Sequence, residues 1–518
     1  LDFDYICESQ LPVLYEAAAD GKFHVGQMAY DVVVVPHLRT MRSTTRNRLW
    51  DFQKQGGTVL WIGGRPEYLD AEPAGPEAFA FGRIISFERA QLYQALEPWR
   101  DLSLTDEKGE PVWNMISQMR QEQEERWLFL AVGTRDLPEY QPKGRQLCLK
   151  VRGEFGVQQY DPLAGTQKWL HTEIRDGWTW MTLNHFEDDS ILLRLRSHTN
   201  ESVPAVTEDP PVFRAYLRGP VKYRLSEPNV LLLDQVVLSE SGSTDGEKEE
   251  EILKAEDQLR RRYGYRLRSE SFPQPWLEKE KTCKTKEILL TYTFASAYEA
   301  DHIRLAAEAE PDWEVSANGE ICRRLEEFWL DEAFVLYELP VLKKGENTIG
   351  IRLPFGKQTA LERCFLLGDF GVETDGMKNT LTKKPETLQY GDITRQQFPF
   401  YGGNLTYLTE LHMEQKQHVY VQVPDFAGAL VSVRVAGKEE QPVFCAPYMA
   451  DLGVLDKGEY PLEITCFGNR YNQFGQLHSC NRKERYYGPW MWRTEGADWS
   501  KEYQLKPAGI LSSPLLYR

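Results

Sequence analysis

One phrase occurs twice in the C-terminal half of the chain. The first copy reads WEVSANG at 313–319 and LKKGENTI at 342–349, and the second reads VSVRVAG at 431–437 and LDKGEYPLEI at 455–464. In both copies the glycine that ends the first stretch predicts a tight turn after a strand, and Lys-Gly-Glu predicts a chain reversal before the next strand. The repeat therefore predicts two tandem jelly-roll β-sandwiches, over 209–380 and 381–518.

The N-terminal part has a different pattern. Apolar runs at 30–35 (YDVVVV) and 58–62 (TVLWI) predict buried parallel strands. Between them we expect a helix from Ser43, as its N-cap, to about Gln55, ended by Gly56. We predict a small α/β domain over 1–105, which is too short for a (β/α)₈ barrel of about 250 residues.

The middle of the chain predicts an antiparallel β-sandwich over 106–208. Short apolar-alternating runs at 127–132, 146–151, 178–185 and 191–195 predict its strands. After residue 239, an acidic stretch leads into ILKAEDQLRRRYG, whose acids precede its bases in the order that suits a helix dipole. We interpret this stretch as a solvated helical insertion in the third domain. The predicted fold class is multidomain and mainly β.

Charge and composition exclude several functions. The 518 residues carry 78 acidic and 61 basic side chains, for a net charge of −17, which disfavours binding to nucleic acid. No apolar run is long enough to cross a membrane.

Eight cysteines occur without a CxxC pair, which favours a reducing compartment. The compartment stays open, with the cytoplasm preferred.

The repeated phrase resembles the galactose-binding-like domains of large glycoside hydrolases, with Ala436 in place of the usual Asn in the second copy. The stretch 464–478, Gly488-Pro-Trp490 and Leu505-Lys-Pro-Ala-Gly509 resemble the same proteins. The run 30–36 resembles the amidotransferase-like domain that follows the catalytic barrel in several of them. The order of these modules is similar to that of family 106 α-L-rhamnosidases, and family 2 enzymes share individual modules.

The resemblance implies a non-catalytic, carbohydrate-binding accessory region of such an enzyme. Its partners would be an oligosaccharide or plant-type glycan and the catalytic barrel of the same parent chain. Because the chain opens in mid-pattern at Leu1, we expect that barrel upstream and expect the chain alone to be inactive. No cofactor is expected, and structural calcium is compatible with sandwiches of this type.

A polar, aromatic loop at 469–499 is the predicted sugar site. Aromatic faces beside amides and guanidinium groups suit hydroxylated rings. The candidates are Trp490, Trp492, Trp499, His478, Asn472 and Arg485, joined by Tyr401 and Tyr448 from neighbouring loops. The alternative is that these rings pack the end of a sandwich or an interface with the barrel.

No catalytic pair is predicted. Glycoside cleavage needs two carboxylates across the scissile bond. Glu326-Glu327 and Asp331-Glu332 flank a predicted strand edge beside Trp329, where we expect them to be solvated. Two other hypotheses stay open: a purely structural or oligomerisation module without glycan binding, and a complete glycosidase with an unrecognised site.

Overall fold

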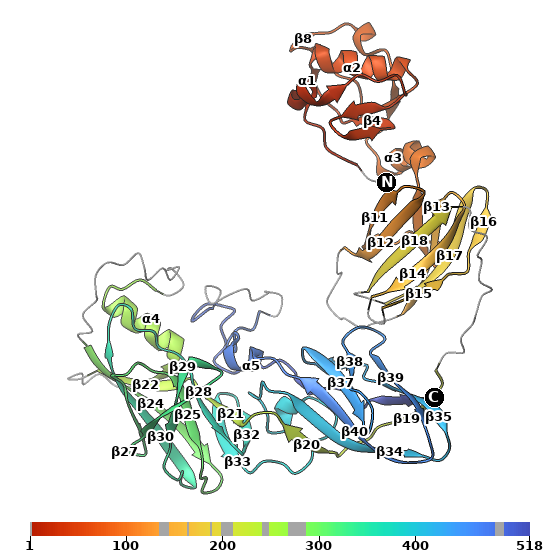
Figure 1. Cartoon of the computed structure of the whole chain (residues 1–518). Coiled ribbons are helices and arrows are strands. Elements are labelled where there is room, and N and C mark those ends of the chain that lie inside the picture. Colours follow the sequence, from red (N-terminus) through yellow and green to blue (C-terminus); the bar gives the residue numbers. More distant parts are fainter. Residues whose placement is uncertain are drawn as a thin grey trace. The chain divides into compact units, whose positions relative to one another are not determined.

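The computed structural model describes residues 3–133, 144–162, 165–186, 189–197, 211–240, 248–267, 286–481 and 492–518. The chain divides into two compact units, 1–208 and 209–518, and most of the elements in both are strands (Figure 1). Among the helices in the described ranges, none combines the length and the apolar character that a membrane crossing requires.

Unit 1 begins with a small parallel sheet. Strands β4 (Val32–Val35), β6 (Thr58–Ile62) and β9 (Arg83–Ile85) pair in parallel, as predicted for the first two, and α2 (Ser43–Lys54) connects β4 to β6. Gly56 has φ +94°, which confirms the predicted helix stop. The predicted cap is wrong, because Ser43 is the first helical residue, and the Asp70 carboxylate accepts its backbone N–H at 2.9 Å.

Shorter elements surround this sheet. They are α1 (Leu11–Leu14), β1 (Tyr15–Glu16), β2 (Phe23–Val25), β3 (Met28–Tyr30), β5 (Thr40–Met41), β7 (Tyr68–Leu69), β8 (Glu72–Pro73) and α3 (Arg89–Leu96). The core of this part contains Phe23, Phe52 and Trp61, all fully buried.

Two antiparallel sheets form the rest of unit 1. One contains β10 (Leu102–Asp106), β13 (Arg145–Arg152), β17 (Trp178–His185) and β16 (Glu173–Arg175). The other contains β11 (Met115–Glu122), β12 (Glu125–Val132), β18 (Ser190–Ser197), β14 (Phe155–Asp161) and β15 (Thr166–Trp169). Leucines and valines of both sheets share one core, so the strands predicted here are confirmed.

Unit 2 contains two sandwiches. In the first sandwich (229–382), one sheet has the order β21 (Asn229–Leu233), β31 (Cys364–Gly368), β25 (Arg304–Glu308), β29 (Asp331–Glu338), β28 (Arg323–Trp329). The facing sheet has the order β23 (Glu249–Glu251), β22 (Gln235–Glu240), β24 (Lys286–Ser296), β30 (Gly345–Phe355), β26 (Glu314–Ala317), β27 (Glu320–Ile321), with β32 (Gly371–Asp375) and β33 (Lys378–Thr382) attached through β24.

The second sandwich combines residues 213–225 with residues 405–517. Its sheets have the orders β19 (Phe213–Tyr216), β42 (Leu515–Tyr517), β35 (Gln417–Gln422), β39 (Met449–Leu455) and β20 (Lys222–Leu225), β34 (Leu405–Met413), β40 (Gly458–Phe467), β37 (Leu430–Val435), β38 (Gln441–Val443). Short elements complete it: β36 (Phe426–Ala427), α5 (Tyr471–Phe474) and β41 (Gly509–Ile510).

The repeated phrase occupies the same place in both sandwiches. The order β24-β30-β26-β27 in the first matches β34-β40-β37-β38 in the second. Asn318 and Gly319 have φ of +50° and +88°, as a two-residue hairpin turn requires, and Gly437 has φ +82° at the equivalent turn. The repeat therefore corresponds to the same pair of adjacent strands in each sandwich, β26 with β30 and β37 with β40.

The two sandwiches are nested rather than tandem. Strands β19 and β20 precede the first sandwich in the chain but pair with β42 and β34 of the second. Ser226 N–H donates to the Asn404 carbonyl at 3.0 Å, and Asn404 N–H donates to the Ser226 hydroxyl at 2.8 Å. The first sandwich is thus inserted into a hairpin of the second, which differs from the predicted division at 380/381. The repeated phrase does not predict this nesting, because it covers only later strands of each sandwich and neither β19 nor β20.

Helix α4 (Ile252–Arg262) is packed, not solvated as predicted. Ile252, Leu253 and Leu259 join the core of the first sandwich. The buried Arg260 donates to the buried Glu256 at 2.6 Å and to the Thr359 carbonyl at 2.8 Å. The acids and bases of this helix therefore include a buried pair that fixes it to the loop at 357–361.

Replacing Glu256 by Ala leaves the buried Arg260 without its charged partner, although backbone carbonyls still accept from it. We expect Glu256→Ala to lower the free energy of unfolding by about 3–5 kcal/mol. Chemical denaturation of the full chain measures the change. Arg261→Ala is the control, since its side chain is exposed and pairs with Glu495 at the surface, and its effect should stay below about 1 kcal/mol. Equal effects of the two variants would show that the buried pair does not stabilise the helix.

Candidate functional site

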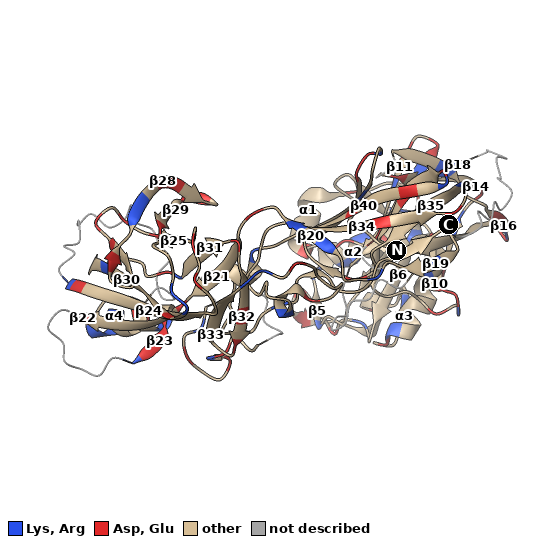
Figure 2. Ribbon diagram, turned by 90° about the horizontal axis from the view of Figure 1, so that it is seen from below, with Lys and Arg blue, Asp and Glu red and all other residues tan. Residues whose placement is uncertain are grey.

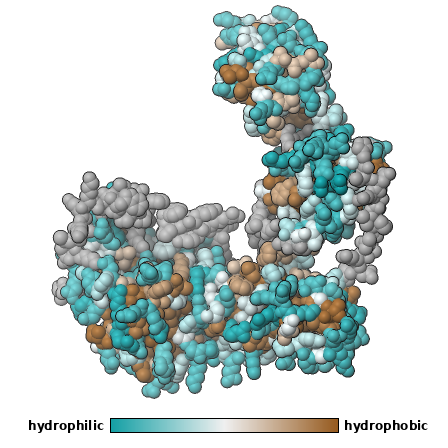
Figure 3. Space-filling view, in the orientation of Figure 1, coloured by the Kyte–Doolittle hydropathy of each residue, from teal (hydrophilic) through white to brown (hydrophobic). Residues whose placement is uncertain are grey.

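A groove of about 920 Å³ lies on the first sandwich beside β28 and β29 and reaches β20 of the second. Its lining combines aromatic side chains with charges of both signs. The aromatic residues are Tyr223, Phe328 and Trp329, the acids are Glu227, Glu327, Glu338, Asp369 and Glu386, and the bases are Arg224, Arg304 and Lys384. Both signs also follow one another along β28 (Figure 2). On the face seen in Figure 3, apolar patches of unit 2 alternate with hydrophilic ones.

A break in strand pairing exposes one aromatic ring in this groove. The register between β28 and β29 shifts on both sides of Phe328, and such irregularities re-aim side chains. Phe328 is 54% exposed, whereas its neighbour Trp329 is 7% exposed. Trp329 packs against Phe365 of β31 and Phe474 of α5. The groove thus has an exposed ring beside a firmly buried one.

The charged side chains of the lining are held by partners. Arg304 donates to Glu327 at 2.7 Å, and Arg323 Nε donates to Glu338 at 3.0 Å. Lys384 pairs with Asp369, and Arg470 Nη2 donates to Glu227 at 2.6 Å. The hydrogen bond from Arg323 and its positive charge lower the pKa of Glu338. These groups are oriented and charged before any ligand arrives, and a carboxylate has lone pairs left to accept from hydroxyl groups.

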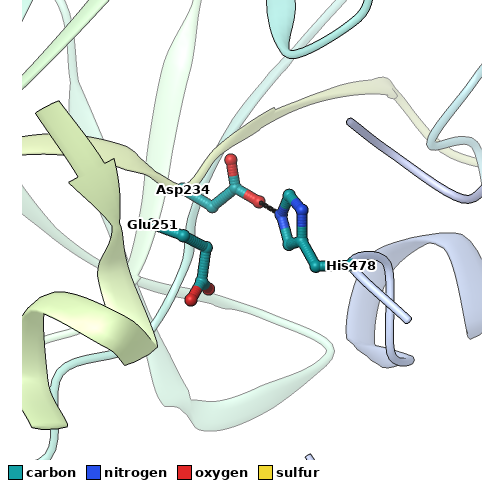
Figure 4. A group of neighbouring side chains, drawn as sticks. All are labelled: Asp234, Glu251 and His478. Atoms are coloured by element: carbon teal, nitrogen blue, oxygen red, sulfur yellow. Dashed lines mark hydrogen bonds and ion pairs between the residues drawn. The ribbon is translucent and has the colours of Figure 1, made fainter. Parts of the chain in front are cut away.

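A buried polar cluster lies where the second sandwich docks on the first. The docking segment (469–481 and 492–508) places Phe474 and Leu477 against the core of the first sandwich. His478 Nε2 lies 3.0 Å from Asp234 Oδ2, and Nδ1 lies 2.9 Å from the Ser500 carbonyl oxygen. Figure 4 shows the Asp234 and His478 side chains meeting, with the Glu251 carboxylate to one side of them.

The two carboxylates of this cluster come from residues at which one element passes into the next. Asp234 joins β21 to β22, and its Oδ1 accepts from the Tyr503 hydroxyl at 2.6 Å. Glu251 is the N-cap of α4, and its Oε2 accepts from Lys254 N–H at 3.1 Å. The other oxygen of Glu251 is buried and has no hydrogen-bond partner among the described residues.

Burial and charge act against each other in this cluster. Burial tends to raise the pKa of Asp234, but the hydrogen bond and charge of His478 outweigh it and lower that pKa. Burial tends to lower the pKa of His478, but the hydrogen bond and charge of Asp234 raise it. Burial raises the pKa of Glu251. Asp234 and His478 therefore suit an ion pair, while Glu251 favours a bound proton or another cation.

Three residues of the predicted sugar site meet at this cluster or beside it. Trp499 stacks on His478, with ring centroids 6.1 Å apart. Lys254 Nζ lies 4.6 Å from the centroid of the Trp499 ring. Trp492 is partly buried against the first sandwich, with the Arg363 guanidinium 5.4 Å from its ring. These aromatic side chains pack where the two sandwiches join.

The other predicted residues lie elsewhere. Asn472 is buried and exchanges hydrogen bonds with the backbone of Lys506. Tyr401 is buried in the second sandwich, and Tyr448 packs against Phe426 there. Trp490 and Arg485 lie outside the described residues. The sugar-binding role of the whole set stays a prediction. Its buried members could only position other residues of a site, because a ligand at the surface would not contact them.

Sequence reasoning missed the groove and the carboxylates of the cluster. The sequence singled out Glu327 and Trp329 at a predicted strand edge. The exposure of Phe328 depends on an irregularity in strand pairing, which no residue pattern predicts. Asp234 did leave a signal, since it interrupts the apolar run VLLLDQVVL at 230–238. A lone acid inside two otherwise buried strands needs a partner.

Comparisons with known proteins give a likeness at low identity. No protein-family model and no curated protein matches the chain. Among solved structures it is similar to a rhamnosidase from Novosphingobium sp. PP1Y (13% identity, TM-score 0.47, 99% of this chain and 36% of that one). It is also similar to an exo-carrageenase GH42 from Bacteroides ovatus, with 9% identity and a TM-score of 0.23 over 33% of this chain and 23% of that one. An α-L-rhamnosidase from Streptomyces avermitilis has 11% identity and a TM-score of 0.18 over 74% of this chain and 32% of that one. The chain spans about a third of the first enzyme.

Tyr401 provides a test of its structural position. Its hydroxyl accepts from Ser226 N–H at 3.0 Å and donates to the Asn404 carbonyl at 2.8 Å, at the point where the first sandwich is inserted. We expect Tyr401→Phe to lower the free energy of unfolding by about 0.5–1.5 kcal/mol, because it removes two hydrogen bonds of a buried hydroxyl, while Ser226 N–H and the Asn404 carbonyl stay bonded to each other. Tyr390→Phe is the control, since the buried hydroxyl of Tyr390 has no partner within the described ranges. A control as destabilised as Tyr401→Phe would refute this role.

Proposed function

We propose that the chain is a non-catalytic, carbohydrate-binding accessory region of an α-L-rhamnosidase-like glycoside hydrolase, and that the groove beside β28 and β29 holds the glycan. The observation that carries this proposal is the exposed ring of Phe328 among oriented ionic groups. The repeated phrase, which resembles galactose-binding-like domains, supports the same ligand class.

The chemistry of the groove matches that of a sugar. The C–H face of a pyranose ring can lie on an aromatic ring, and Phe328 offers such a face. Sugar hydroxyls can donate to Glu327 and Glu338 and accept from Arg304, which are already paired with one another or with neighbours. Charged hydrogen-bond partners that need no reordering reduce the entropic cost of binding.

The size and charge of the groove narrow the ligand class. Its volume of about 920 Å³ falls within the range of small-molecule sites. Five acids and three bases line it, and Arg323 and Arg470 pair with two of the acids, so the charges balance and favour an uncharged ligand. We therefore infer a neutral oligosaccharide, of the plant type that the resemblance implies.

We further propose that catalysis belongs to the barrel that the resemblance implies for the parent protein, and not to the groove. An acid that protonates a glycosidic oxygen needs a raised pKa. Glu338 has a lowered pKa instead, because Arg323 donates to it and is positively charged. This carboxylate suits binding and not proton donation.

Binding should depend on Phe328. We expect Phe328→Ala to weaken the affinity for a bound neutral oligosaccharide roughly tenfold, which corresponds to about 1.4 kcal/mol of lost stacking. Calorimetric titration of the full chain against a panel of rhamnose- and galactose-containing oligosaccharides measures it. Phe129→Ala is the matched control, because Phe129 is 40% exposed on a strand of unit 1. Absence of binding across the panel would favour the structural module, and unchanged affinity of Phe328→Ala would refute the groove.

The non-catalytic assignment has its own test. We expect the purified chain to release no nitrophenol from aryl α-L-rhamnoside or aryl β-galactoside above the rate of a heat-denatured control. Clear turnover by the chain would contradict the assignment, because it would require a complete active site within these residues.

A further inference from the structure

We propose that Asp234, Glu251 and His478 together bind one divalent transition-metal ion, Zn²⁺ in the first instance, at the junction of the two sandwiches. This proposal does not rest on the function of the groove. It rests on the geometry of three buried side chains and on one oxygen that lacks a partner.

The three side chains are close enough to share an ion. One ligand atom from each lies within 4.8 Å of the other two, and all three residues are at most 4% exposed. Asp234 Oδ2 and His478 Nε2 are 3.0 Å apart. Two ligands of a tetrahedral zinc ion, each about 2.1 Å from it, lie roughly 3.4 Å from each other. Small side-chain shifts would therefore bring three ligands to one centre.

Glu251 supplies the independent observation. It is 3% exposed, and its Oε1 has no hydrogen-bond partner within the described part of the chain. A buried carboxylate oxygen without a partner is costly, unless a proton or a metal ion compensates it. A bound cation would satisfy Glu251 and the Asp234–His478 pair at once.

The atoms that would not touch the ion are already held. His478 Nδ1 faces the Ser500 carbonyl at 2.9 Å, so that Nδ1–H can donate there and leave Nε2 for the ion. Asp234 Oδ1 accepts from Tyr503, and Glu251 Oε2 accepts from Lys254 N–H. Outer partners of this kind orient the ligands in metal sites. The ion would replace the proton on Nε2.

The donor set and charge favour zinc over calcium. Calcium takes six to eight oxygen ligands, whereas two carboxylates and one imidazole match the ligands of zinc. Arg363 lies close enough to influence the charges of the cluster, and its Nη1 donates to the carbonyls of Gln473 and Gly475. With a neutral imidazole, the two carboxylates still exceed Arg363 by one negative charge. The cluster therefore attracts a cation.

Glu251→Gln distinguishes a metal ion from a proton. If Glu251 is merely protonated, glutamine has nearly its shape and can keep the bond from Lys254, so the unfolding temperature should not change. If Glu251 binds a metal ion, Glu251→Gln should lose that ion together with the stabilisation it provides. Glu250→Gln is the matched control, because Glu250 pairs with Lys254 and Lys248 outside the cluster.

The experiment is a titration of the chelator-treated full chain with Zn²⁺, followed by calorimetry and thermal unfolding. We expect one equivalent to bind wild type and Glu250→Gln and to raise their unfolding temperatures by several degrees, with at least a tenfold loss of affinity in Glu251→Gln. Zinc binding that survives in a folded Glu251→Gln would place the ion elsewhere and overturn the proposal. Wild type that binds no zinc would overturn it as well, even if the variant fails to fold.

Discussion

The contact between Asp234 and His478 joins two sandwiches that are built from interleaved parts of the chain. Asp234 belongs to the first sandwich, and His478 comes from a segment that leaves the second. Because both groups are buried, each would be costly alone, and together they fix the docking segment on the core of the first sandwich. The same segment places Phe474 against Trp329 and Arg470 near the Trp329 ring.

The groove depends on this docking. Phe474 of the docking segment packs against Trp329, and the neighbouring Phe328 is exposed in the groove. Arg470 of the segment also pairs with Glu227 of the lining. The proposed glycan site is therefore assembled from the first sandwich and from a segment of the second, and loss of the junction would disturb binding without any change to the lining residues themselves.

Local pattern predicted much of the fold, and long-range pairing explains the rest. The parallel strands at 32–35 and 58–62 and the presence of two sandwiches in the C-terminal half followed from apolar runs and turn glycines. The nesting did not, because β19 and β20 are four residues each and carry no part of the repeat. The burial of α4 was missed because Glu256 and Arg260 look like surface charges until their partners across the fold are known. Polar and aromatic composition selected His478 and Trp499 as sugar-binding candidates, a role that stays a prediction, but it could not predict that they contact Asp234 and one another.

Hydrogen exchange of the full chain, with and without a saturating neutral oligosaccharide, tests whether a glycan binds in the groove beside β28 and β29. A glycan in the groove should slow exchange in peptides that cover 323–338 and 384–386, where Phe328, Glu338 and Lys384 line it. Exchange in unit 1 should stay unchanged. Protection confined to other peptides, or no protection at full occupancy, would contradict a glycan site beside β28 and β29.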